Sequence, residues 1–189
     1  MKINLRLMAA VFALGTVIAC TEDEPATPVI PNEEELITTL KWQLISADEQ
    51  DTLNFLFRDV DGDGGAAPTI ETMDLKANTT YAASLQLLNE LENPAEDITE
   101  EVSAEAEEHQ FFYQSTISGL NVSYADSDLN QNPVGILTNI STADTSSGDL
   151  TITLLHMPDK FANGVAAGDI TQAGGETDIS VSFNLNVQP

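Results

Sequence analysis

The feature that most constrains the fold is a strict alternation of apolar and polar side chains near the C-terminus. Apolar residues occupy every odd position from Ile179 to Val187, and Ser, Asn or Gln occupies every even position from Ser180 to Gln188. This period of two is typical of an antiparallel strand that has one face in the core and the other in water. We therefore expect this end of the chain to lie in a half-buried β-sheet.

Further stretches with the same period lie between turns rich in Gly, Asn, Asp and Pro. The clearest are residues 36–45, 52–58, 81–88 and 150–154, and the weaker candidates are 69–75, 110–117, 119–124 and 134–140. Together they predict eight or nine short strands at the spacing of a sandwich. The expected fold is all-β, an antiparallel β-sandwich of immunoglobulin-like or jelly-roll-like type, in a single domain over residues 36–189.

One segment departs from this pattern and favours a short helix. In residues 94–108, the apolar Ile98, Val102 and Ala106 recur every four residues, and acidic residues fill the first turn, where the helix dipole favours them. Like charges four residues apart oppose the helix. We therefore expect an acidic helix inserted between strands that depends on packing against the sheets.

The first 20 residues resemble the leader of a bacterial lipoprotein. Lys2 and Arg6 accompany an uncharged apolar run, residues 7–19, which is too short to span a membrane and suits the core of a signal peptide. The run ends in Val17-Ile18-Ala19-Cys20, which resembles the lipobox. The resemblance implies a signal peptide over residues 1–19 and a lipid anchor on Cys20, the one cysteine of the chain; an ordinary signal peptide is the alternative.

Residues 20–35 are expected to be an acidic, proline-rich tether. Thr21-Glu22-Asp23-Glu24 resembles the export signal that lipoproteins of Bacteroidetes carry after the cysteine, and three prolines within residues 25–31 favour an extended spacer. The resemblance implies a place in the cell envelope, on the outer face of the outer membrane. An anchor that faces the periplasm is the alternative.

The charge of the chain excludes two classes of partner. The sequence has 31 acidic and 6 basic residues, and removal of residues 1–19 leaves four bases and all 31 acids, a net charge of −27. No basic stripe is present to displace counterions from nucleic acid, and no polybasic patch to hold the protein on anionic lipid. We expect no nucleic-acid partner, and contact with the membrane through the lipid anchor.

Two acidic loops are candidate calcium sites. The first carries Asp59, Asp61 and Asp63 before Gly64, which resembles the start of an EF-hand loop, although Ile70 occupies the position of the bidentate glutamate. The second loop offers oxygen ligands at Asp126, Asp128 and Asn130. Ca²⁺ takes six to eight oxygen ligands, and an ion here would relieve repulsion between carboxylates. We expect a structural Ca²⁺; solvated acidic turns are the alternative.

The two histidines, His109 and His156, are the other candidate ligands. His156 is expected on the inward side of its strand, and His109 begins the strand that carries Phe111 and Tyr113. If the two side chains meet, they offer a site for a metal ion or haem. The alternative is two interior histidines with hydrogen-bond partners, because the pair lacks a recognised metal-ligand spacing.

Sequence patterns of catalysis are missing, so we expect no enzyme. The chain has no G-x-S-x-G motif, no phosphate-binding loop and no dinucleotide fingerprint. We expect a non-catalytic binding or accessory module, for example one that works beside an outer-membrane receptor. The alternatives are a metal- or haem-capturing lipoprotein that uses His109 and His156, and a structural, adhesin-like surface protein.

Several segments of the chain are similar to those of short flavobacterial lipoproteins of unknown function. The segments are residues 33–39, 57–65, 75–81, 108–113, 154–156 and 174–179. Members of this group sometimes carry the label type 1 periplasmic binding fold, which implies two α/β lobes. The strand-rich pattern of this chain predicts a β-sandwich instead. The resemblance implies a family and a compartment, and it supplies no activity.

Overall fold

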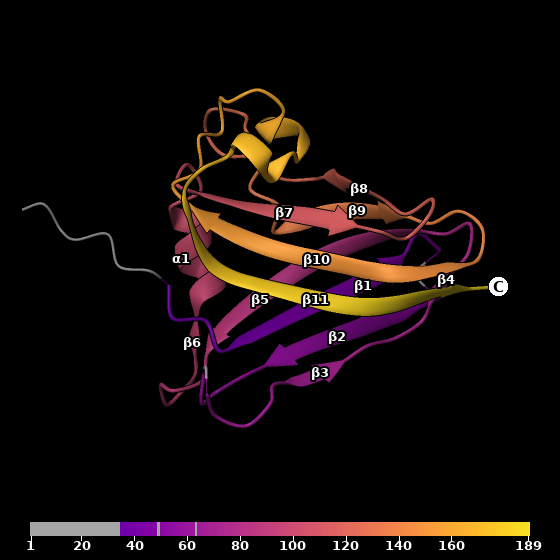
Figure 1. Ribbon diagram of the computed structural model, residues 1–189, viewed down its shortest axis with the longest axis horizontal. Helices are drawn as coiled ribbons and strands as arrows, with labels where there is room; N and C mark the ends of the chain where they lie inside the picture. The colour runs from indigo at the N-terminus through magenta and orange to yellow at the C-terminus, as the bar shows by residue number, and fades with distance from the viewer. Residues whose placement is uncertain (1–34, 49, 63) are drawn as a thin grey trace, which may run out of the picture. The chain divides into compact units, whose positions relative to one another are not determined.

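The computed structural model describes residues 35–48, 50–62 and 64–189, and these form two β-sheets with one short α-helix (Figure 1). The larger sheet has the strand order β3-β2-β1-β5-β9-β8, with β6 paired to β5, and the smaller sheet has the order β4-β11-β10-β7. The pairs are antiparallel except for β4 with β11. The predicted all-β sandwich is confirmed.

Each predicted segment overlaps a strand, although several bounds differ by a few residues and residues 69–75, predicted as one strand, are divided between the two sheets. The larger sheet contains β1 (Thr39–Ser46), β2 (Thr52–Arg58), β3 (Thr69–Glu71), β5 (Thr80–Asn89), β6 (Glu96–Asp97), β8 (Asn121–Tyr124) and β9 (Leu137–Ser141). The smaller sheet contains β4 (Leu75–Lys76), β7 (His109–Ser115), β10 (Ser146–His156) and β11 (Glu176–Gln188). Two very short strands, β4 and β6, raise the number of strands in the described residues above the eight or nine expected.

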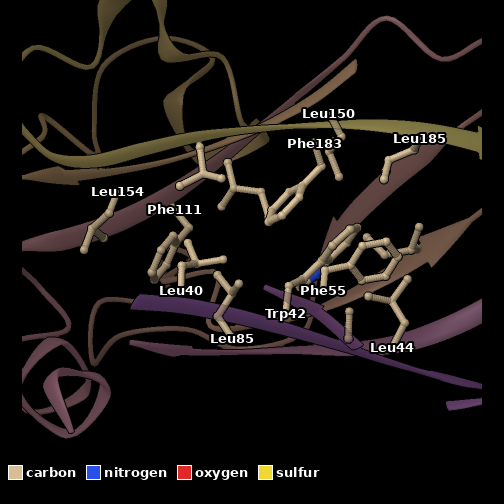
Figure 2. Packing of buried hydrophobic residues seen from close by; sticks show 14 of the residues in the cluster. Leu40, Trp42, Leu44, Phe55, Leu85, Phe111, Leu150, Leu154, Phe183 and Leu185 are labelled. Atoms are coloured by element: carbon tan, nitrogen blue, oxygen red, sulfur yellow. The ribbon is translucent and has the colours of Figure 1, made fainter. Parts of the chain in front are cut away.

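The inner faces of the two sheets share one apolar core (Figure 2). Its members include Leu40, Trp42, Leu44, Phe55 and Leu85 from the larger sheet and Phe111, Leu150, Leu154, Phe183 and Leu185 from the smaller. Along β11, every second residue from Ile179 to Val187 is buried. The alternation in the sequence therefore marks the face that packs, as expected when removal of apolar surface from water drives the fold.

The helix α1 (Ile98–Ala104) is shorter than the segment predicted for it. Asp97 caps its N-terminus by accepting the backbone N–H of Thr99 at 3.0 Å, and Ile98 and Val102 are buried as expected. Residues 96–97 pair with β5, and the chain turns after Glu105 to enter β7. The residues predicted as helix on either side of α1 therefore form the connections between α1 and the sheets.

The segment between β10 and β11 packs on the outer face of the smaller sheet. It contains two 3₁₀ turns, η1 (Val165–Ala167) and η2 (Ile170–Gln172), and Val165 and Ala173 cover Phe112 and Leu155 in a second apolar cluster. Phe112 points opposite to Phe111 because successive side chains of a strand alternate between its faces, and this covering segment is what buries it. The end of the β7–β10 pair is therefore buried on both faces, close to α1 (Figure 1).

The leader (residues 1–19), Cys20 and the tether up to residue 34 lie outside the described residues, as does Asp63. Within the described part of the chain, no helix has the length and apolar character needed to cross a membrane.

Candidate functional site

The two histidines lie side by side at one end of the smaller sheet. His109 is the first residue of β7 and His156 the last residue of β10, and the two are direct partners across the strands. Their ring centroids are 4.4 Å apart with the planes at 39°. The residues are 0% and 2% exposed. The condition for a shared site, that the two side chains meet, is therefore fulfilled.

A β-bulge brings a third ligand group, Asp178, to this pair. Leu154 pairs with Ile179, whereas Leu155 pairs with Thr177, so Asp178 is an extra residue on β11. Strict alternation would place Asp178 on the outer face, but a bulge can re-aim a side chain, and this carboxylate is fully buried at 0% exposure. Asp178 could not be identified from the sequence, because the bulge has no signature within β11 itself.

The three side chains are close, but their polar atoms are spaced more widely than hydrogen bonds allow. The carboxylate oxygens of Asp178 lie 3.8 Å from Nε2 of His109 and 3.8 Å from Nδ1 of His156. A hydrogen bond between such atoms would measure about 2.7–3.2 Å. The candidate ligand atoms of the three residues all lie within 4.8 Å of one another. This spacing leaves a position between them that a cation could bridge.

The hydrogen bonding of His109 fixes which nitrogen carries its proton. Nδ1 lies 3.1 Å from the carbonyl oxygen of Glu105, so Nδ1–H donates and Nε2 keeps a lone pair. Burial lowers the pKa of His109 to about 4, so the ring is neutral at pH 7. Nε2 therefore has the protonation state that metal binding requires.

Three imidazole nitrogens at this place are buried without hydrogen-bond partners in the described part of the chain. They are Nε2 of His109 and both nitrogens of His156. Buried polar atoms in folded proteins are almost always hydrogen-bonded, and an unsatisfied one costs about 1–3 kcal/mol. These nitrogens can therefore take a further partner, either a hydrogen bond or a cation.

Glutamates gather at the solvent side of the histidines. Glu35 and Glu105 form a second group with His109 whose ligand atoms lie within 4.8 Å of one another. Burial, followed by the charges of Glu101, Asp178 and Glu105, raises the pKa of Glu35 to about 7. Glu108 is half exposed and its carboxylate lies 3.8 Å from Nε2 of His156. Acidic side chains that reach solvent therefore lie beside the buried histidines.

The first acidic loop follows β2 as expected and is exposed to solvent. Asp59 accepts the backbone N–H of Gly62 at 2.9 Å, and Asp61 accepts that of Ala66 at 2.8 Å. These bonds leave further oxygen lone pairs on both carboxylates. Calcium binding by Asp59, Asp61 and Asp63 stays a prediction.

The second acidic loop already has a positive charge. Asp126 accepts backbone N–H bonds, one of them from Gly135 at 2.7 Å, and Asp128 accepts the N–H of Asn130 at 2.9 Å. The ammonium of Lys160 lies 3.1 Å from Asp128, and both side chains are buried. This ion pair supplies the neutralisation for which Ca²⁺ was expected, so the electrostatic reason for a calcium ion at this loop is weaker than at the first.

The sequence matches no protein-family model, and comparison of the chain with curated proteins and with solved structures found no match. The function is therefore inferred from the geometry of the site.

Proposed function

We propose that this protein is a cell-envelope lipoprotein that binds a divalent transition-metal ion, best matched by Zn²⁺, between His109, His156 and Asp178. The observation that carries the proposal is the group of buried imidazole nitrogens that lack hydrogen-bond partners in the described chain and face a buried carboxylate at 3.8 Å. The lipobox-like sequence at Cys20 supports the anchor and the compartment.

The ligand chemistry suits Zn²⁺. Imidazole and carboxylate groups bind this ion at about 2.0–2.2 Å in tetrahedral geometry, so two ligand atoms on one ion lie about 3.3–3.6 Å apart. The present ligand atoms lie within 4.8 Å of one another. The Asp178–histidine distances of 3.8 Å are close to this spacing, and the widest pair of ligand atoms must contract by at most about 1.5 Å to close on an ion. Two histidines and one carboxylate leave a fourth position for water or an exchanging ligand.

Glu108 is placed to orient His156 in the loaded state. Nδ1 of His156 faces Asp178, so the tautomer that binds an ion through Nδ1 carries its proton on Nε2. Nε2 faces the Glu108 carboxylate at 3.8 Å, and a small movement would make a hydrogen bond between them. A carboxylate that fixes the tautomer of a ligating histidine is a recurrent feature of zinc sites. Glu108 is therefore a positioning residue.

The arrangement favours a bare ion over haem. The two rings are in contact, with centroids 4.4 Å apart, and leave no slot for a planar macrocycle between them. The proposal accordingly takes the metal alternative for His109 and His156 and not the haem alternative.

Calorimetric titration of the full-length chain with Zn²⁺ tests the proposal. We expect one tightly bound ion per chain for the wild type and loss of that binding in His156→Asn and in Asp178→Asn. Asp149→Asn is the matched control, because Asp149 is an exposed aspartate on β10, the strand of His156, and its Oδ1 accepts from the Asn184 side chain away from the site. Absence of binding to the wild type, or equal binding by all four proteins, would overturn the proposal.

The envelope part of the proposal has its own test. Metabolic labelling with palmitate is expected to mark the wild type and to leave Cys20→Ala unlabelled. Equal labelling of the two proteins would remove the lipid anchor from the proposal.

A hollow on the outer face of the larger sheet supports the second function, a binding or accessory module. It measures about 410 Å³ and is lined by side chains from four elements, among them Lys41, Gln43, Asn54, Glu71 and Gln86. A second hollow of about 530 Å³ next to α1 shares Leu85 and Gln86 with it. A ligand held here would bind His156→Asn as well as the wild type, which separates this function from metal binding.

A further inference from the structure

The buried ligands have no direct access to solvent. The side chains of His109, His156 and Asp178 are 0%, 2% and 0% exposed. An ion that reaches them must therefore first pass side chains that do meet water. The group made by Glu35, Glu105 and His109 satisfies this requirement, because Glu105 is exposed, Glu35 is half-buried and His109 belongs to both groups.

Glu105 approaches His109 in two ways. It is the C-cap residue of α1, and its carbonyl oxygen accepts Nδ1–H of His109 at 3.1 Å. Its carboxylate oxygen belongs to the second group of ligand atoms, within 4.8 Å of a ring nitrogen of His109 and of the Glu35 carboxylate. Nδ1 is engaged with this carbonyl, whereas Nε2 is buried without a hydrogen-bond partner in the described residues and lies 3.8 Å from Asp178, so His109 can accept an ion through Nε2.

We propose that Glu35, Glu105 and His109 form an outer cation position, through which a divalent ion passes to the inner position of His109, His156 and Asp178. The inference rests on the proposed function, because the two positions share His109. The inner position holds the ion more tightly, since it offers two imidazoles and is enclosed. The outer position offers two carboxylates at the surface, where an ion keeps part of its water.

The charge around the outer position suits this role. Glu101, one helical turn before Glu105 on α1, interacts with the carboxyl of Glu35, and Glu108 lies beside His156. Clustered charges of one sign at the mouth of a site raise the local concentration of counterions and the rate of association by about 10- to 1,000-fold. The acidic residues in and after α1 destabilise an isolated helix by repulsion between like charges, and here they serve to attract cations to the outer position.

Stopped-flow measurement of Zn²⁺ association with the full-length chain tests the outer position. We expect Glu35→Gln/Glu105→Gln to slow association by about tenfold while one inner ion per chain is still bound. Both substitutions keep the shape of the side chain, and the measurement is made above pH 7, where Glu35 is ionised and each substitution removes one charge. Glu100→Gln is the matched control, because it removes one charge from α1 at a residue that lies toward the hollow on the other side and belongs to neither ligand group.

Zn²⁺ binding at equilibrium tests the outer position in variants whose inner position is disabled. His156→Asn, with His156→Gln as the second variant if the first fails to fold, is expected to retain weak Zn²⁺ binding. Adding Glu35→Gln and Glu105→Gln should remove that binding, and adding Glu100→Gln should leave it.

Two results would overturn the outer position alone. One is equal association rates in the wild type and the double variant; the other is residual Zn²⁺ binding in His156→Asn that does not change when Glu35→Gln and Glu105→Gln are added. Failure of the wild type to bind Zn²⁺ tightly would overturn the proposed function, whatever the behaviour of the glutamates.

Discussion

The carboxyl of Glu35 has a pKa that is raised to about 7, and its surroundings in the folded protein explain this shift. Burial and then the charges of Glu101, Asp178 and Glu105 disfavour the ionised form in the folded protein. The folded chain therefore binds more protons than the unfolded chain between about pH 4.5 and 7. The stability that Glu35 contributes is fully present below pH 4.5 and is lost as the pH rises through about 7.

Replacing Glu35 with Gln should remove this pH dependence. We expect Glu35→Gln to melt at a higher temperature than the wild type above pH 7 and at the same temperature below about pH 4.5. Thermal melts of both proteins in metal-free buffer across this range provide the measurement. A difference that does not change with pH would show that the Glu35 carboxyl is not held in this environment.

His109 titrates with the opposite sign. Its pKa is lowered to about 4 by burial, so its contribution to stability is present above pH 6.5 and is lost as the pH falls through 4. Because the two effects oppose each other in the wild type, the comparison of Glu35→Gln with the wild type is needed to separate them.

Gly175 sets the path of the chain into β11 and past His156. Its φ is +76°, and a Cβ there would lie 2.4 Å from the carbonyl oxygen of His156. Gly174 also has a positive φ, +59°, but a Cβ there would meet nothing within 4 Å. We expect Gly174→Ala to cost about 1–2 kcal/mol of unfolding free energy from backbone strain, and Gly175→Ala to cost clearly more because of the clash.

Urea denaturation of the two glycine variants measures this difference. Equal losses for the two would mean that the chain relaxes away from His156 without cost, and that the approach of β11 to the histidines is not fixed by Gly175.

At the scale of elements, Lys160 fastens three segments together. Its ammonium donates to the carbonyl oxygen of Ala106 after α1 and to that of Pro133, and it pairs with Asp128 at 3.1 Å. Burial lowers the pKa of Lys160, and Asp128 opposes the shift. The ion pair thus connects the end of α1, the loop before β9 and the segment that covers the smaller sheet.

Removing the cation alone should be costly. Lys160→Met leaves the Asp128 carboxylate buried without its counter-charge, and we expect a loss of about 3–5 kcal/mol of unfolding free energy. Adding Asp128→Asn should recover part of the loss, because the uncompensated charge is then gone. Chemical denaturation of both variants gives the values; a single variant as stable as the wild type would exclude a structural role for the pair.

The strands and the inward histidines were predictable because both depend on local alternation. The period of two places His156 on the same face as Leu154, and the structure confirms this. Asp178 was not predictable, because it faces inward through a bulge whose register depends on β10. Lys160 escaped detection for a similar reason, since its partner Asp128 lies 32 residues away and the loop pattern suggested calcium instead.

The bounds of α1 could not be predicted from the sequence for a different reason. The spacing of Ile98 and Val102 predicts a helix correctly, but not where it ends. Its bounds are set by pairing of residues 96–97 with β5 and by the turn into His109. Competition between helix and sheet is a tertiary effect that periodicity alone does not report.

At the scale of the whole molecule, a large negative charge makes cation binding a source of stability. An ion that binds the folded chain alone at a hundredfold excess over its dissociation constant adds about 2.7 kcal/mol. For a domain of this size, that corresponds to a rise of roughly 5–10 °C in melting temperature. The two kinds of site in this chain predict different patterns of stabilisation.

We expect Zn²⁺ to raise the melting temperature of the wild type and to leave His156→Asn nearly unchanged. Millimolar Ca²⁺ should raise the melting temperature of both proteins equally if the loop of Asp59, Asp61 and Asp63 binds it, and chelator should reverse the effect. Calorimetric melts with each ion distinguish the sites. No response to Ca²⁺ would remove the calcium prediction, and an equal response of both proteins to Zn²⁺ would place zinc elsewhere.

The central claim, that two buried histidines and an aspartate bind a metal ion, is tested most directly by anomalous diffraction from zinc-loaded crystals. The account predicts one peak within about 2.0–2.2 Å of Nε2 of His109, Nδ1 of His156 and an oxygen of Asp178. A peak confined to surface carboxylates, with the two rings still in contact and no density between them, would contradict it.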